Sequence, residues 1–196
     1  MLGTGRIGVA FSRIMKGFGC RLLAHDVYEN DDFKALGEYV NLDRLLAESD
    51  IVSLHCPLLE STKHIMNDDT FAQMKSDAML INTSRGALVD TQAAIRALKA
   101  KQIGSLGLDV YEGEGSLFYN DHSGEILDDD DLMRLMTFHN VLVCGHQAFF
   151  TEEALREISE VTLRNFEDFA QGRQCENALI KEGKTLVRCN TSTVRI

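Results

Sequence analysis

The chain opens on a glycine-rich run, MLGTGRIG, whose residue types could bind a phosphate group. Gly3, Gly5 and Gly8 form a GxGxxG pattern directly before a segment with helical periodicity. In such a turn the first glycine permits a tight bend, the second lets the backbone approach a pyrophosphate, and the third lets the helix pack on a sheet. Unpaired N–H groups at the helix start favour the phosphate charge. Because the pattern alone is weak, a chance or structural turn is the alternative.

An acidic residue follows at the position that dinucleotide binding requires. Asp26 ends the next predicted strand, RLLAHD, and its carboxylate could accept hydrogen bonds from ribose hydroxyls. The same charge would repel the 2′-phosphate of NADP, so the pattern favours NAD. The alternative is a solvated carboxylate at the end of a strand.

Arg85 lies in the segment INTSRGALVD, just after another predicted strand. Ligands of open α/β sheets bind beyond the carboxyl ends of the strands. A guanidinium group can hold a carboxylate through two parallel hydrogen bonds. Considered alone, Arg85 is interpreted more simply as a member of a surface ion pair than as a ligand-binding group.

Two further segments, LDVYEGE and CGHQAFF, supply acidic residues and a histidine after two more strands. A histidine held by a carboxylate can move a proton to or from a carbonyl oxygen, because the carboxylate favours the imidazolium. His146 and Glu114 could form such a pair, although one histidine and one glutamate in separate loops are commonly coincidental. We interpret His64, His122 and His139 as surface or packing residues, and His55 as a core or cofactor-adjacent residue.

Strand and helix patterns alternate along the chain, which predicts βαβ units and a parallel sheet. The strands are apolar throughout, as in a sheet that is covered on both faces. Asp90 and Thr151 are predicted helix N-caps, and the residues after Cys175 show no clear element. We predict helices over residues 7–18, 41–50, 67–76, 91–102, 131–138 and 151–172, and strands over 21–26, 51–56, 78–84, 105–111 and 141–145.

Composition excludes several other classes of function. The 196 residues carry a net charge of −10, which argues against nucleic-acid binding, since that relies on clustered Lys and Arg. There is no apolar run of membrane-spanning length and no signal-peptide pattern. The five cysteines are scattered without CxxC spacing, so the sequence predicts neither a metal site nor a disulfide framework. We expect a reduced, cytoplasmic protein.

Five segments together resemble the D-isomer-specific 2-hydroxyacid dehydrogenases in order and spacing, from about residue 3 to 180. HQAFFTEEA is similar to the D-lactate dehydrogenase branch. The resemblance implies a Rossmann-type domain with a doubly wound parallel sheet in the strand order 3-2-1-4-5-6. It also implies NAD as the cofactor and hydride transfer to pyruvate or a similar 2-keto acid. The segments are GTGRIG, HCPLLESTKHIMNDDTFAQMK, INTSRGALVD, LGLDVYEGE and GHQAFFTEEA.

Matching the motifs residue by residue implies specific roles. Arg85 would hold the substrate carboxylate and polarise the carbonyl, His146 would be the acid/base group, and Glu114 its partner. Asp109 would support the cofactor and the same network. Cys56, Pro57, Thr83 and Ser84 would line the nicotinamide side, and Arg6 and Ile7 would belong to the pyrophosphate turn.

The resemblance also implies a domain organisation. Members of the family have two domains and are expected to form homodimers. We expect an NAD-binding domain over residues 1–150, with its first strand largely missing, a helix returning toward the substrate domain over 151–180, and a polar tail of uncertain structure over 181–196. Such a fragment is expected to be inactive in isolation. The alternative is a non-catalytic module that senses NAD(H) or binds a protein.

Overall fold

The computed structural model describes residues 1–196 except 123, 125, 179, 182–183 and 186–196. By internal contacts the chain divides into two units, Met1–His146 and Gln147–Ile196. Among the helices of the described residues, none combines the length and apolar character needed to cross a lipid bilayer.

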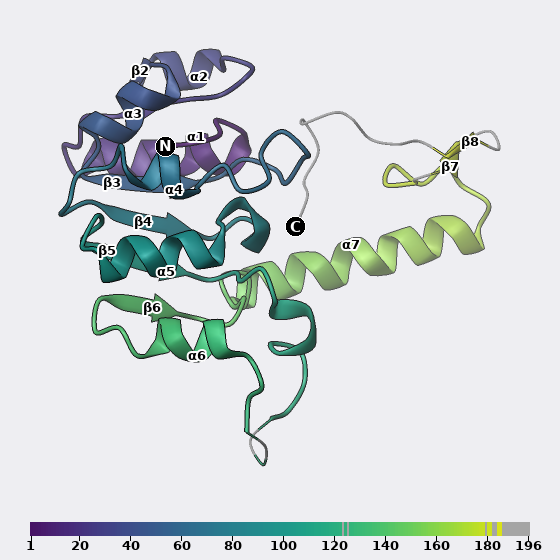
Figure 1. Cartoon of the computed structure of the whole chain (residues 1–196). Helices are drawn as coiled ribbons and strands as arrows, with labels where there is room; N and C mark the ends of the chain where they lie inside the picture. Colours follow the sequence, from purple (N-terminus) through teal and green to yellow (C-terminus); the bar gives the residue numbers. More distant parts are fainter. Residues whose placement is uncertain (123, 125, 179, 182–183, 186–196) are drawn as a thin grey trace. The chain divides into compact units, whose positions relative to one another are not determined.

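The first unit contains a parallel sheet at its centre (Figure 1). Strands β3, β4, β5 and β6 pair in that order, and β1 pairs with β2. Leu2 joins the two parts, because it bridges both His25 and Leu54. This arrangement confirms the predicted Rossmann-type order, with the segment at the N-terminus in the middle. The strands are β1 (Leu23–Ala24), β2 (Glu38–Tyr39), β3 (Ile51–Leu54), β4 (Met79–Asn82), β5 (Ser105–Leu108) and β6 (Val141–Val143).

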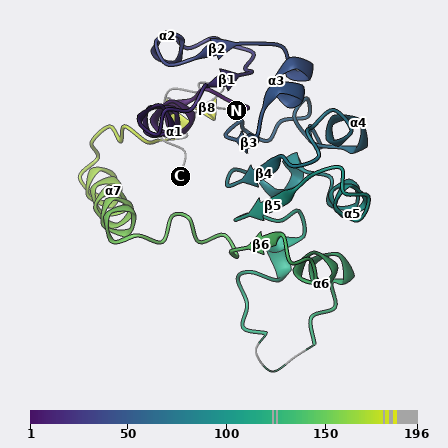
Figure 2. The ribbon, with the colours of Figure 1, turned by 90° about the vertical axis from the view of Figure 1, so that its left-hand side faces the viewer.

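Helices pack on both sides of this sheet, with α3 to α6 on one side and α1 on the other (Figure 2). Asp90 accepts a hydrogen bond from the Ala93 amide at 3.0 Å, which confirms the predicted cap of α5. The α-helices of the unit are α1 (Arg6–Gly17), α2 (Asp31–Lys34), α3 (Leu42–Glu48), α4 (Asp68–Phe71), α5 (Thr91–Lys99) and α6 (Asp130–Met136), and two short 3-10 helices span Gly86–Leu88 and Glu114–Ser116.

The main hydrophobic core lies between the sheet and helices α3 to α6, where alternate strand residues such as Leu54, Leu80 and Leu106 are buried. The opposite face of the sheet differs from the prediction of two covered faces. Met79 and Leu142 remain 37% and 65% exposed there. The physical reason is that α1 packs over the part of that face near Met1 and His55, and not over β6.

Helix α1 forms where it was predicted, but with a different face inward. The periodicity of its apolar side chains predicts one apolar face, yet its buried residues are Gly8, Val9 and Ser12. Small residues allow the helix to approach the glycine turn closely, and Ser12 donates a hydrogen bond to Gly8 O at 2.8 Å. Ile7, Ile14 and Phe18 are therefore exposed.

Short elements escaped the sequence analysis. Helix α2 and strand β2 are four and two residues long, which leaves too few positions for a periodic pattern. In the second unit, α7 (Glu152–Ala170) starts at the predicted cap Thr151. Beyond it, β7 (Ile180–Lys181) and β8 (Lys184–Thr185) pair antiparallel, in the segment after Cys175 where the sequence showed no clear element. The rest of that tail, 186–196, lies outside the described residues.

Candidate functional site

The glycine turn has the geometry that its sequence predicts. Gly3 has a φ of +95°, and a Cβ atom there would lie 2.5 Å from the Cys56 nitrogen, so a side chain is excluded. At Gly8 a Cβ would lie 2.3 Å from Gly3 O, which shows how closely α1 packs on the turn. Gly5, the N-cap of α1, faces open space and leaves its backbone accessible to a ligand.

Asp26 lies beside this turn, and it also stabilises the turn. Its Oδ2 atom accepts hydrogen bonds from the amide and hydroxyl of Thr4 at 2.6 and 2.9 Å. The Thr4 hydroxyl in turn accepts a bond from the Tyr39 hydroxyl at 2.8 Å, and Thr4 O accepts one from Asn30 Nδ2 at 3.0 Å. Thr4 is therefore a site residue that sequence reasoning missed, and the signal was its place between two motif glycines.

The wall next to the turn is formed by the residues that follow β3. His55 stacks on Phe11 with ring centroids 5.0 Å apart, and its Nε2 lies 2.9 Å from the Ser53 hydroxyl. Burial lowers the pKa of His55 to about 4, so its ring is neutral at neutral pH. Burial also raises the pKa of the Cys56 thiol to about 11, which keeps it protonated. This wall therefore carries no charge at neutral pH, as suits an uncharged ring system.

The loop that carries Arg85 is organised by Asn82, which is fully buried at the end of β4. Its side chain donates to Arg85 O at 2.8 Å and accepts from the Ser84 amide at 3.1 Å. Ser84 donates through its hydroxyl to Cys56 O at 2.8 Å and so connects two successive loops. Sequence reasoning missed Asn82, although a lone amide in an otherwise apolar strand was the available signal. Thr83 and Arg85 are exposed.

His146 and Glu114, which the sequence analysis paired, are in contact. His146 Nδ1 lies 2.9 Å from Glu114 Oε1, and the second carboxylate oxygen accepts the Tyr111 amide at 2.9 Å. The Tyr119 hydroxyl, which the sequence analysis did not select, lies 2.8 Å from the same Nδ1. His146 adopts a φ of +57° and donates its amide to Asp109 O at 2.5 Å, which fixes the start of its side chain.

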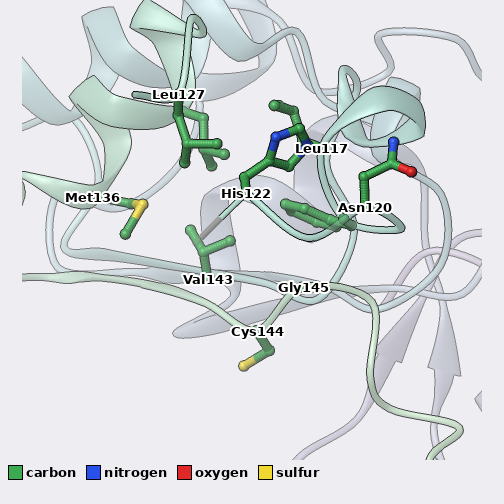
Figure 3. A pocket seen from close by; sticks show the side chains of 10 residues that line it. Leu117, Asn120, His122, Leu127, Met136, Val143, Cys144 and Gly145 are labelled. Atoms are coloured by element: carbon green, nitrogen blue, oxygen red, sulfur yellow. The ribbon is translucent and has the colours of Figure 1, made fainter. Parts of the chain in front are cut away.

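A cavity of about 440 Å³ lies between the end of β6 and residues of the segment 117–136 (Figure 3). The side chains of Leu127, Met136 and Val143 surround it. Among the described residues that line it there is one histidine, His122, and no Lys or Arg. The lining residues are Leu117, Phe118, Asn120, His122, Leu127, Leu132, Met136, Val143, Cys144 and Gly145.

The predicted residues thus fall into connected groups along the carboxyl ends of the strands. The glycine turn contacts His55 and Cys56, and Cys56 is bonded to Ser84 in the Arg85 loop. Asp109 donates its amide to Asn82 O at 2.9 Å, and this links the Arg85 loop to the segment that holds His146. Arg6, Ile7 and Pro57 are exposed nearby. Arg85 Nη1 donates a hydrogen bond to Ser84 O at 2.7 Å.

Comparison with known proteins gives a consistent result. Residues 1–148 match the family model described as "D-isomer specific 2-hydroxyacid dehydrogenase, NAD binding domain". Over 196 residues the chain is 60% identical to 2-hydroxyacid dehydrogenase A of Aspergillus oryzae, covering 100% of this chain and 56% of the relative. Over 181 residues it is 54% identical to the D-lactate dehydrogenase of Escherichia coli, covering 92% of this chain and 55% of the relative.

A solved structure agrees with the fold. The D-lactate dehydrogenase of Lactobacillus jensenii with NAD⁺ superposes with a TM-score of 0.84 at 37% identity, over 92% of this chain and 54% of that protein. The chain therefore spans just over half the length of the relatives that it matches.

Proposed function

Because the chain belongs to the D-isomer-specific 2-hydroxyacid dehydrogenase family and carries its NAD-binding domain, we propose that it is the cofactor half of a D-lactate dehydrogenase. The proposed reaction is the reduction of pyruvate, or a similar 2-keto acid, with NADH. Three features of the structure support this proposal: the glycine turn, the Arg85 loop and the His146–Glu114 pair.

The residues around the glycine turn fit a dinucleotide. Gly5 presents open backbone at the start of α1, where uncapped N–H groups and the helix dipole favour a pyrophosphate. Asp26 would accept the ribose hydroxyls, in exchange for or in addition to its bonds with Thr4. Cys56, Thr83 and Ser84 would lie along the nicotinamide side. When bound, NADH would supply the hydride.

Arg85 would bind the substrate. Its position after β4 and its exposure leave the guanidinium accessible to a carboxylate, for which its fork geometry is suited. A bond from the same group to the keto oxygen would polarise the carbonyl. Asn82 fixes the backbone from which Arg85 extends.

His146 would donate the proton to the keto oxygen, and Glu114 would hold the ring in position through their 2.9 Å contact. Reduction then requires protonated His146, whereas oxidation of the hydroxy acid requires the neutral ring. The observation that carries the proposal is this 2.9 Å contact, since a module that merely bound NAD(H) or a protein would not need it.

Two measurements test the proposal. The 196-residue chain should bind NADH, detected by its fluorescence, and bind NADPH more weakly. The native gene product that contains these residues should oxidise NADH when pyruvate is added, and His146→Gln should lower this turnover roughly 10²–10⁴-fold while leaving NADH binding nearly unchanged. NADH binding without pyruvate turnover in the native gene product would instead favour the non-catalytic module.

The chain in isolation is expected to turn over pyruvate at less than about 1 s⁻¹, the low end for enzymes, because Arg85 is exposed to solvent rather than enclosed. We further propose a cytoplasmic location, no nucleic-acid partner and a homodimer for the native protein. Fractionation and light scattering would test the location and the dimer.

A further inference from the structure

A second histidine–carboxylate pair lies beside the proposed substrate-binding loop. His64 Nε2 is 2.6 Å from Glu112 Oε1, and both side chains are about one-third exposed, at 35% and 34%. His64 belongs to the loop after β3, whereas Glu112 belongs to the loop after β5. The sequence analysis treated His64 as a surface or packing residue, and the mechanism proposed above uses neither residue.

The pair spans the loop that carries Arg85. On one side, the His64 amide donates to Ala87 O at 2.8 Å and the Met66 amide donates to Leu88 O at 3.0 Å. On the other side, a Cβ atom on Gly86 would lie 2.2 Å from the Tyr111 carbonyl carbon, so the backbones are in close contact. The segment after Arg85 is therefore held between the two loops that His64 and Glu112 connect.

The backbone of His64 indicates that its position is constrained. Its φ of +51° lies in the left-handed region, which non-glycine residues adopt at a cost in energy. Asn67 Nδ2 donates to His64 O at 3.0 Å, and together with the His64–Ala87 bond this keeps the strained conformation. In this conformation the His64 Nε2 atom lies 2.6 Å from Glu112 Oε1. A solvated surface histidine would not require a strained backbone.

We infer that His64 and Glu112 are positioning residues, whose contact fixes the loop that presents Arg85 to the substrate carboxylate. This inference rests on the role proposed for Arg85. Neither residue needs to touch substrate or cofactor. Loss of the contact would leave the segment from Gly86 to Leu88 held by its backbone hydrogen bonds to His64 and Met66, and these bonds would open more often.

Amide hydrogen exchange on the 196-residue chain tests this inference without any need for turnover. His64→Asn tolerates the positive φ but cannot reach Glu112, and Glu112→Gln keeps the shape of the side chain but not its charge. Each variant, and the double variant, should speed exchange of the Met66 and Leu88 amides about tenfold, the size of one charge-assisted hydrogen bond. Arg13→Ala breaks a more exposed ion pair, with Asp32, and should leave exchange of these amides unchanged.

The double-variant cycle decides the result. Equal effects in the single and double variants support a coupled pair. Unchanged exchange in the single variants, or effects that multiply to about a hundredfold, would overturn the inference. In the native gene product both single variants should raise the KM for pyruvate about tenfold with the NADH Kd unchanged within about twofold. If the native protein reduces no pyruvate, the proposed function fails, and the exchange measurement still decides whether the pair holds the loop.

Discussion

Acid should destabilise this protein through His55. Burial lowers its pKa from 6.5 to about 4, so the unfolded chain binds a proton more readily than the folded one between these values. Stability is then fully present above pH 6.5 and is lost as the pH falls toward 4. The free energy of unfolding that is lost through His55 amounts to about 2 kcal/mol at pH 5 and to about 3 kcal/mol below pH 4.

The assay is urea unfolding of the 196-residue chain, followed by circular dichroism at about pH 7.5 and pH 5. His55→Gln removes the titrating group, and the free energy of unfolding of this variant should fall about 2 kcal/mol less than that of the wild type between the two pH values. Burial lowers the pKa of the Met1 amino group to about 5, so acid also destabilises the protein through this group. The wild type and the His55→Gln variant share this contribution. His139→Gln is the matched control, because His139 is exposed and should leave the wild-type loss unchanged.

The reasoning is refuted if His55→Gln and the wild type lose the same free energy on acidification. Such a result would mean that the His55 ring is protonated in the folded state without cost. It would also remove the argument that the wall beside the glycine turn is uncharged.

Three other changes should give distinct results. Gly3→Ala places a Cβ 2.5 Å from Cys56 N and should cost about 2 kcal/mol of unfolding free energy or more, measured in urea, with loss of NADH binding. Asp26→Ser should narrow the preference for NADH over NADPH, and equal affinities in the wild type would contradict the assignment. Glu114→Gln should lower kcat for pyruvate reduction without changing NADH binding, because it weakens the contact that holds the His146 ring; an unchanged kcat would exclude Glu114 as the partner.

The sequence by itself determined the fold class and the order of the chemical groups. Strand and helix periodicities are local properties, so the parallel α/β pattern and the caps Asp90 and Thr151 were readable without contacts. Residue type and spacing also selected Gly3, Asp26 and the His146–Glu114 pair, since each carries chemistry that few other residue types supply. Structure then showed that His146 and Glu114, 32 positions apart, are in contact.

Tertiary structure decided which face each element buries and which polar groups support the site. Apolar periodicity suggested one apolar face for α1, but close packing on the turn selected the small residues Gly8 and Ser12, because bulkier side chains would not fit. Asn82 and the His64–Glu112 contact depend on loops that converge only after the parallel strands have paired. Hydrogen bonds between residues 48 positions apart leave no periodic trace in a single sequence, and for that physical reason they emerged from the structure alone.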